Sequence, residues 1–540
     1  MDAAMPAVRR MGRDRVDRRM SLLLVAGLLA ATWFSHGVLL PGIDPHAAAD
    51  FQKLSIVWMG SSLLHQPLWG MSIGAIGTGP YVIAAVVLQL LAVLVRQIGT
   101  SAVREVTSAR IDRAVLVATV AIAIVQAWFL ATYLERSQQP TGPLVSSPGW
   151  RFRFEAICAL VAGTMLLVTI ARVVTAIARV NGIAVLLAFE AVGGIAQGAR
   201  WLTSADAPLL PYIASLALGV GLAAFLLRFR RRIPLRDARG RSGVPALAMT
   251  LGPGGGTALS VGAMLLAGVS MSALLTRSSG ISNFLSVTQA PYLSTLAALC
   301  VGLAIALPAL FQVPARTGEG LREAGLCFPG VRPGADTEAY ARTLWRRLMP
   351  GSAAVLVGLA IGVPILLEAA GVLRPGQMPV RGASLLLLVA VWLDGRLALR
   401  GATTVTVPSA GTPPGAAAEA GGRCPACSSE VADGFAVCWS CGGPVAPISP
   451  LPTPPALPEP PPEGGAPVTV ARLVFPIDAE IARLKLEAQG IPVRLLDYHI
   501  VLANWFLGVA VGGIRVQVPE ECAPAARELL FPPEPTVRGR

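Results

Sequence analysis

The sequence predicts an all-α polytopic membrane protein with ten transmembrane helices, followed by a cysteine-containing module and a small α+β domain. Only 14% of the 540 residues are charged, against about 25% in soluble proteins, and the mean hydropathy is +0.63. Ten apolar segments interrupt the first 400 residues, and after them the composition shifts abruptly to Gly, Pro and paired Cys. Most of the chain before residue 400 is therefore expected to contact lipid or other apolar helices.

The length and composition of the apolar segments predict the membrane helices. At 1.5 Å per residue, about 20 apolar residues span a bilayer. The first segment follows six Arg in the first 19 residues and lacks a clear cleavage site, so it is expected to be an uncleaved membrane helix. The fifth has only 14 residues and contains Glu190, which suits a bundle in which a polar group faces a cavity. The segments are residues 21–40, 72–95, 114–134, 155–177, 182–195, 209–227, 257–275, 290–311, 349–371 and 382–399.

The distribution of Arg between these segments predicts the orientation. If the N-terminus is cytoplasmic, the inner side collects 24 Arg and the outer loops hold seven. This asymmetry requires an even number of spans and places both chain ends in the cytosol. Because the Arg residues lie between apolar runs, the net charge of +13 indicates membrane topology rather than nucleic-acid binding.

Several stretches carry a family resemblance. They are Leu-Pro-Gly-Ile-Asp at 40–44, Gly-Thr-Gly-Pro-Tyr at 77–81, Arg-Arg-Ile-Pro-Leu at 231–235, Gly-Leu-Cys-Phe-Pro-Gly-Val-Arg-Pro-Gly at 325–334, and Trp-Leu-Asp at 392–394. In this order they resemble SecY, the channel subunit of the protein translocase, from about residue 20 to residue 400.

The resemblance implies a SecY-like bundle of two halves around an hourglass pore for unfolded protein substrates. It implies SecE-like and SecG-like small subunits, and a SecA-like ATPase or the ribosome as the source of energy. Arg231, Arg232 and Arg332 would form the docking surface for these, although Arg231 and Arg232 are also explained as a topology signal at a helix end. The implied location is the bacterial cytoplasmic (inner) membrane.

The expected pore ring departs from the family pattern of isoleucines. Matched by motif, it falls on Thr78 and Val82 of the second helix and on Leu187 and Ala191 of the fifth. Gly and Pro at 252–256 interrupt the start of the seventh helix, and the usual Gly-Gly of the plug is missing around 63–69. These changes predict that the narrowest part of the pore, here called the waist, is more polar and leaks ions more readily than in the family pattern.

Gln89, Glu190 and Asp394 are polar residues inside apolar segments. We expect Gln89 to make a polar contact between helices. Glu190 and Asp394 are candidates for a functional role, since acids inside membranes are costly. For Asp394, pairing with the nearby Arg396 is the simpler expectation.

Two Cys-x-x-Cys pairs, formed by Cys424 with Cys427 and Cys438 with Cys441, follow the membrane part. Four thiolates at this spacing predict a zinc ribbon with one structural Zn²⁺. A redox-active pair and an iron–sulfur cluster are the alternatives. The domain boundaries expected here are 1–400 for the channel domain, 401–422 for a linker, 423–443 for the ribbon, 444–467 for a Pro-rich linker and 468–531 for the α+β domain.

The last domain is expected to contain strand 469–477, helix 478–489, strand 491–497, a Gly-rich connection, strand 514–519 and helix 519–530. It resembles a small bacterial domain family described only as signal-transducing.

Two functions fit the whole chain. One is a protein-conducting channel subunit of a Sec-type translocase. The other is a divergent SecY-like membrane scaffold or sensor that presents its cytoplasmic tail to partners. An enzyme is not expected, because the four His residues are scattered at 36, 46, 65 and 499 and no nucleophile–base pair is suggested. The sequence has no phosphate-binding loop, so energy must come from a partner.

Overall fold

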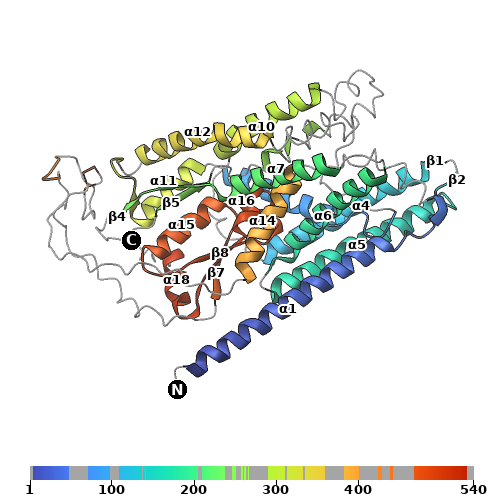
Figure 1. Cartoon of the computed structure of the whole chain (residues 1–540), viewed down its shortest axis with the longest axis horizontal. Coiled ribbons are helices and arrows are strands. Elements are labelled where there is room, and N and C mark those ends of the chain that lie inside the picture. The colour runs from blue at the N-terminus through green and yellow to red at the C-terminus, as the bar shows by residue number, and fades with distance from the viewer. Residues whose placement is uncertain are drawn as a thin grey trace, which may run out of the picture.

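In the computed structural model, long helices lie side by side and a smaller α+β unit packs at one end of them, opposite strands β1 and β2 (Figure 1). The structure describes residues 4–47, 71–97, 109–136, 138–139, 142–178, 180–204, 209–237, 246–250, 257–259, 261–262, 265–266, 290–310, 313–332, 335–358, 382–399, 424–427, 438, 440–441 and 467–531.

The helices of the bundle overlap the predicted apolar segments, but the first and the ninth begin 17 and 14 residues before them, and the ninth segment is described only to residue 358. They are α1 (Ala4–Gly37), α3 (Gly79–Gln97), α4 (Ala109–Arg136), α5 (Trp150–Ile177), α6 (Gly182–Ser204), α7 (Leu209–Arg228), α10 (Ala290–Leu310), α12 (Ala335–Val357) and α14 (Gly382–Leu399). The predicted seventh segment is described only at a few helical positions from 257 to 266.

Among the described residues, three helical stretches are long and apolar enough to cross a membrane. These are Arg19–Gly37, Ile111–Arg136 and Trp150–Ile177, and shorter apolar helices occur at Gly79–Leu91, Gly182–Val192, Leu216–Arg228 and Ser294–Leu307. Large apolar side chains point outward, including Trp33 at 70% exposure and Phe129 at 69%, as lipid contact requires. The total of ten spans stays a prediction.

Helices α5 and α6 approach each other closely at a glycine. A Cβ on Gly182 would lie 2.2 Å from the carbonyl oxygen of Ala171, so no larger residue fits without a shift. The Thr175 hydroxyl accepts a hydrogen bond from the Gly182 backbone N–H at 2.8 Å. Small residues of this kind let membrane helices pack backbone against backbone. This contact fixes the start of α6, which is the shortest predicted span.

The loops on the side of the α+β unit form two small antiparallel pairs. Strand β3 (Arg230–Ile233) pairs with β5 (Leu247–Thr250), and β4 (Arg236–Asp237) pairs with β6 (Leu326–Cys327). Helix α11 (Val313–Ala324) precedes β6. The second pair joins the loop after α7 to the loop before α12, so the two predicted docking loops are neighbours. At the other end of the bundle, β1 (Gln138–Gln139) and β2 (Gly142–Pro143) form a short hairpin.

The C-terminal unit is a three-stranded antiparallel sheet with helices packed on it. The sheet order is β7-β9-β8. The elements are β7 (Pro467–Leu473), α15 (Pro476–Glu487), β8 (Arg494–Leu496), α16 (Tyr498–Ala503), α17 (Leu507–Ala510), β9 (Ile514–Pro519), the 3₁₀ helix η3 (Glu520–Cys522) and α18 (Ala523–Leu530). The predicted strands and longer helices are present.

The Gly-rich connection before the last strand contains helical structure that the sequence did not predict. The chain there forms the two short helices α16 and α17, which are almost wholly buried. Helices of six and four residues are too short to form on propensity alone, so packing against the bundle stabilises them. One continuous apolar core runs from the bundle helices into this unit.

Several sequence predictions concern residues outside the described part of the chain. They are the plug region at 63–69, the Gly-Pro run at 252–256, and the linkers at 401–422 and 444–466.

Candidate functional site

The predicted waist positions lie just before α3, on α3 and on α6. Thr78 is fully buried, and its hydroxyl donates to Glu190 Oε1 of α6 at 3.2 Å. Val82 and Ala191 are buried, and Leu187 is half-buried. The structure therefore joins the two helices through a hydroxyl–carboxylate contact at the predicted waist. Glu190 was expected to face a cavity, and here it lies against Thr78.

Gln89 makes a polar contact between helices, as predicted, and its partners lie in the C-terminal unit. Its amide Nε2 donates to the carbonyl oxygen of Trp505 at 2.7 Å, and its Oε1 accepts from the Val509 N–H at 3.3 Å. Both partners belong to the α16–α17 region, more than 400 residues away in the sequence. A buried amide in an apolar helix must be satisfied, and here the C-terminal unit satisfies it.

Asp394 has a different partner from the one predicted. Its carboxylate accepts hydrogen bonds from the backbone N–H groups of His499 at 3.2 Å and Ile500 at 2.9 Å. The imidazole Nδ1 of His499 lies 2.7 Å from Oδ1. Arg396 instead lies over the ring of Trp392, 5.5 Å from its centroid.

The tautomer of His499 follows from its second contact. Arg230 Nη2 lies 3.1 Å from Nε2, and a guanidinium has only donors, so Nε2 must accept. The ring proton then resides on Nδ1 and points at Asp394. The guanidinium of Arg230 also lies over the ring of Tyr498, 5.3 Å from its centroid. Asp394, His499 and Arg230 thus form a chain of hydrogen bonds at the start of α16.

Three further side chains bind the same region. Asn181 Nδ2 donates to the carbonyl oxygen of Val511 at 2.7 Å, and the Tyr81 hydroxyl donates to that of Ala510 at 3.1 Å. The hydroxyl of Thr257, in the predicted seventh helix, accepts from the Trp505 N–H at 2.7 Å. Sequence reasoning missed these residues as a site. The available signal was the apolar run at 498–511, which contains the large side chains of Trp505 and Phe506.

A buried ion pair holds α16 in place within its own domain. Arg515 Nε donates to Asp497 Oδ2 at 2.7 Å and Nη2 donates to Oδ1 at 3.2 Å. Asp497 precedes α16 in a left-handed conformation, with φ of 62°. Burial raises the pKa of Asp497, while the Arg515 guanidinium opposes that rise.

The predicted docking arginines are all exposed. Arg231 and Arg232 lie on β3, and Arg332 lies in the turn after β6. Because β4 pairs with β6, the loops that carry them are joined. This arrangement offers guanidinium groups to a large polar partner on one side of the bundle.

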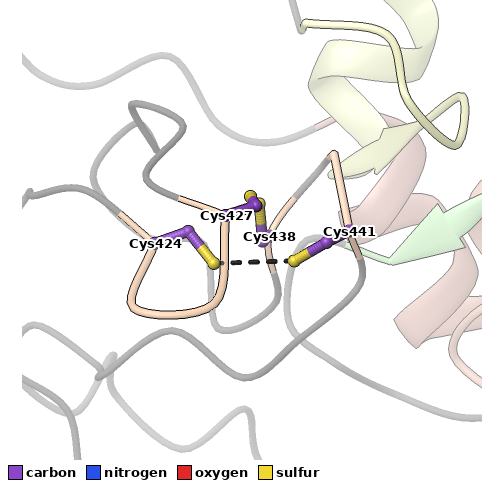
Figure 2. Close-up of side chains that lie close together, drawn as sticks. All are labelled: Cys424, Cys427, Cys438 and Cys441. Carbon is purple, nitrogen blue, oxygen red and sulfur yellow. Dashed lines mark hydrogen bonds between the residues drawn. The ribbon is translucent and has the colours of Figure 1, made fainter.

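The four predicted zinc ligands come together. The Sγ atoms of Cys424, Cys427, Cys438 and Cys441 all lie within 4.8 Å of one another. The separations of Cys424 from Cys441 and of Cys427 from Cys438 are both 3.6 Å, and Figure 2 shows the four side chains converging from two chain segments. A tetrahedral zinc site with Zn–S bonds of about 2.3 Å has sulfurs about 3.8 Å apart. The four thiols therefore fit such a metal ion.

Comparison with known proteins agrees with the sequence resemblance. The SecY subunit of the protein translocase from Escherichia coli is 27% identical over 413 residues, which cover 71% of this chain and 90% of that protein. The SecY subunit from Aquifex aeolicus is 27% identical over 365 residues, covering 61% and 82%. A solved SecY structure, from work on the plug domain in the closed channel, aligns with a TM-score of 0.47 and 16% identity over 70% of this chain and 91% of that one.

The family model of SecY matches residues 72–395, from before α3 to within the last turns of α14. This span contains the waist positions and both arginine loops, and it is more than half of the chain. The chain belongs to the SecY family.

Proposed function

We propose that this chain is the protein-conducting channel subunit of a Sec-type translocase, which moves unfolded polypeptides across or into the cytoplasmic membrane. The observation that carries the proposal is membership of the SecY family over residues 72–395. Relatives in this family are named protein translocase subunits. The outward apolar side chains of the bundle support a place in the bilayer.

The waist is the proposed passage. Thr78 and Val82 from α3 and Leu187 and Ala191 from α6 would narrow it. The Thr78–Glu190 contact makes this constriction more polar than a ring of isoleucines. Apolar constrictions exclude hydrated ions by dewetting, so a hydroxyl and a carboxylate weaken that barrier.

Energy and assembly would come from partners. Arg231, Arg232 and Arg332 are exposed on joined loops, where they would bind carboxylates or RNA phosphates of a SecA-like ATPase or the ribosome. SecE-like and SecG-like subunits would complete the channel. The 24-to-7 distribution of Arg supports ten spans with both chain ends in the cytosol.

The tail would supply two more modules in the cytosol. Residues 423–443 would form a ribbon around one Zn²⁺ held by Cys424, Cys427, Cys438 and Cys441. With four thiolates the site is closed, so the metal would stabilise the fold and perform no chemistry. Residues 401–422 and 444–467 would be linkers, and residues 468–531 would form the α+β domain.

Complementation of a strain depleted of its own translocase channel tests the proposal. We expect the chain, or the chain ended at residue 400, to restore export of secreted proteins together with its SecE-like partner. Failure of both, with normal amounts of protein in the membrane, would favour the alternative of a SecY-like scaffold or sensor.

A further inference from the structure

Residues 498–511, here called the mouth segment, are buried against the bundle. All of these side chains are buried except those of Asn504 and Val509, which are half-buried. The segment is strongly apolar and contains Trp505 and Phe506, at 2% and 9% exposure. In Figure 1, α16 lies beside α14 and α7, between the sheet of the C-terminal unit and the bundle.

The bundle binds the backbone of the mouth segment with polar side chains. The N–H groups of His499, Ile500, Trp505 and Val509 donate to Asp394, Thr257 and Gln89. The carbonyls of Trp505, Ala510 and Val511 accept from Gln89, Tyr81 and Asn181. These five side chains come from α3, from the start of α6, from α14 and from residue 257. Five buried polar groups that converge on one segment form a built site rather than a chance contact.

The site lies next to the proposed waist. Tyr81 lies between the waist positions Thr78 and Val82 in the sequence, and Thr78 contacts α6 at Glu190. The mouth segment therefore reaches the level of the waist from the side of the arginine loops, where Arg230 of β3 contacts His499. A polypeptide that entered from that side would meet the segment before it reached Thr78.

A second set of contacts holds the rest of the domain against α11. Arg316 pairs with Asp478 at 2.9 Å, and Lys485 pairs with Glu323 at 2.7 Å. The side chains of these pairs are 10% to 31% exposed, so the pairs lie at the edge of the interface. The domain is thus held by a buried apolar segment, by these ion pairs and by the packing of α15 on α11, where Ile481 lies against Gly320.

We propose that the ring of Tyr81, Gln89, Asn181, Thr257 and Asp394 is a receptor for an apolar polypeptide segment whose turns or helix ends leave backbone groups unpaired, and that its resident ligand is the chain's own mouth segment. The inference rests on the proposed channel function. An apolar segment of a translocating protein presents the same backbone groups and side-chain chemistry, so it competes for the receptor and displaces the C-terminal domain. Because the displaced domain stays covalently linked to the bundle, its effective concentration is high. The mouth segment therefore binds the receptor again when the translocating protein, here called the client, has passed.

Hydrogen exchange of the full chain in lipid nanodiscs, read by mass spectrometry, tests this inference. The amides of His499, Ile500, Trp505 and Val509 report docking, because their acceptors are bundle side chains. The amides that pair β7 with β9 report the fold of the domain itself. We expect Asp394→Asn to lower protection of the mouth segment about 10- to 100-fold, the factor for a lost hydrogen bond to a charged group. Protection of the β7–β9 amides should not change.

Arg396→Gln is the matched control, since Arg396 is exposed on the same helix and lies over Trp392. It should leave protection of the mouth segment as it is. If Asp394→Asn does not accumulate, Thr257→Ala makes the same test through the Trp505 amide. Equal protection of the mouth segment in Asp394→Asn and Arg396→Gln would overturn the proposal.

A second arm adds a client whose apolar segment is stalled in the channel. Loss of protection at 498–511, with the β7–β9 amides still protected, supports competition, and unchanged protection with the client bound refutes it. If the protein carries no polypeptide, no client will bind in this arm, while the Asp394→Asn arm still reports docking. Failure of the inference and failure of the proposed function are therefore distinguishable.

Discussion

Replacing Arg515 by Met should destabilise the C-terminal domain by several kcal/mol. The side chains of Arg515 and Asp497 are only 7% and 4% exposed. The substitution keeps most of the apolar stem but removes two hydrogen bonds to the carboxylate, at 2.7 and 3.2 Å. It leaves Asp497 charged and buried without its bidentate partner. Breaking a buried pair in this way costs about 3–5 kcal/mol.

The loss of stability in Arg515→Met should depend on pH. Burial already raises the pKa of Asp497, and Arg515 opposes that rise. Without Arg515 the folded-state pKa rises further above the unfolded value of about 3.9, so the folded domain binds the proton more tightly. Stability of the variant therefore falls as the pH increases from about 4 towards the folded-state pKa. The difference in free energy of unfolding between the parent and the variant should be largest near neutral pH and smaller in acid.

Hydrogen exchange at the amides of β9 in the full chain measures this difference. Arg527→Met is the control, because Arg527 is exposed on α18. Adding Asp497→Asn to Arg515→Met should recover part of the loss, since no buried charge then lacks a partner. Equal exchange of the β9 amides in Arg515→Met and Arg527→Met would contradict this prediction. An equal loss of stability at pH 4.5 and 7.5 would contradict it as well.

Three other predictions concern the metal, the waist and the arginine loops. Cys424→Ser should reduce bound zinc from one equivalent per chain to almost none by elemental analysis, and Ser440→Ala should keep it; equal zinc in both would contradict the site. In the Asp394→Asn background, which opens the mouth, Thr78→Ile should lower ion conductance in planar bilayers severalfold, and an equal leak would count against a polar waist. Arg332→Glu should weaken cosedimentation with the motor ATPase or ribosome about tenfold at low salt, and unchanged binding of both partners would exclude this loop from docking.

The membrane helices and the cysteine cluster were predictable because their signals are local. Long apolar runs mark the described helices, and α7, α10 and α14 follow the predicted limits within one residue. The four cysteines form two Cys-x-x-Cys pairs, and this short spacing brings the two cysteines within each pair close together.

The partners of Gln89 and Asp394 were not predictable from local sequence. A buried amide and a buried carboxylate each demand hydrogen bonds, and the sequence indicates that demand. It does not indicate which groups meet it, because those groups are 416 and 105 residues away. Helices α16 and α17 escaped prediction for a related reason, since their stability comes from the bundle against which they pack.

Cross-linking of a stalled client tests the channel most directly. A secretory protein with photoreactive side chains along its length would be arrested in the reconstituted translocase, and the linked sites on this chain would be mapped. The account predicts links to Thr78, Val82 and Ala191 in the bundle interior. Links confined to outward side chains such as Trp33 and Phe129, with none at the waist, would show that polypeptide does not pass through this protein.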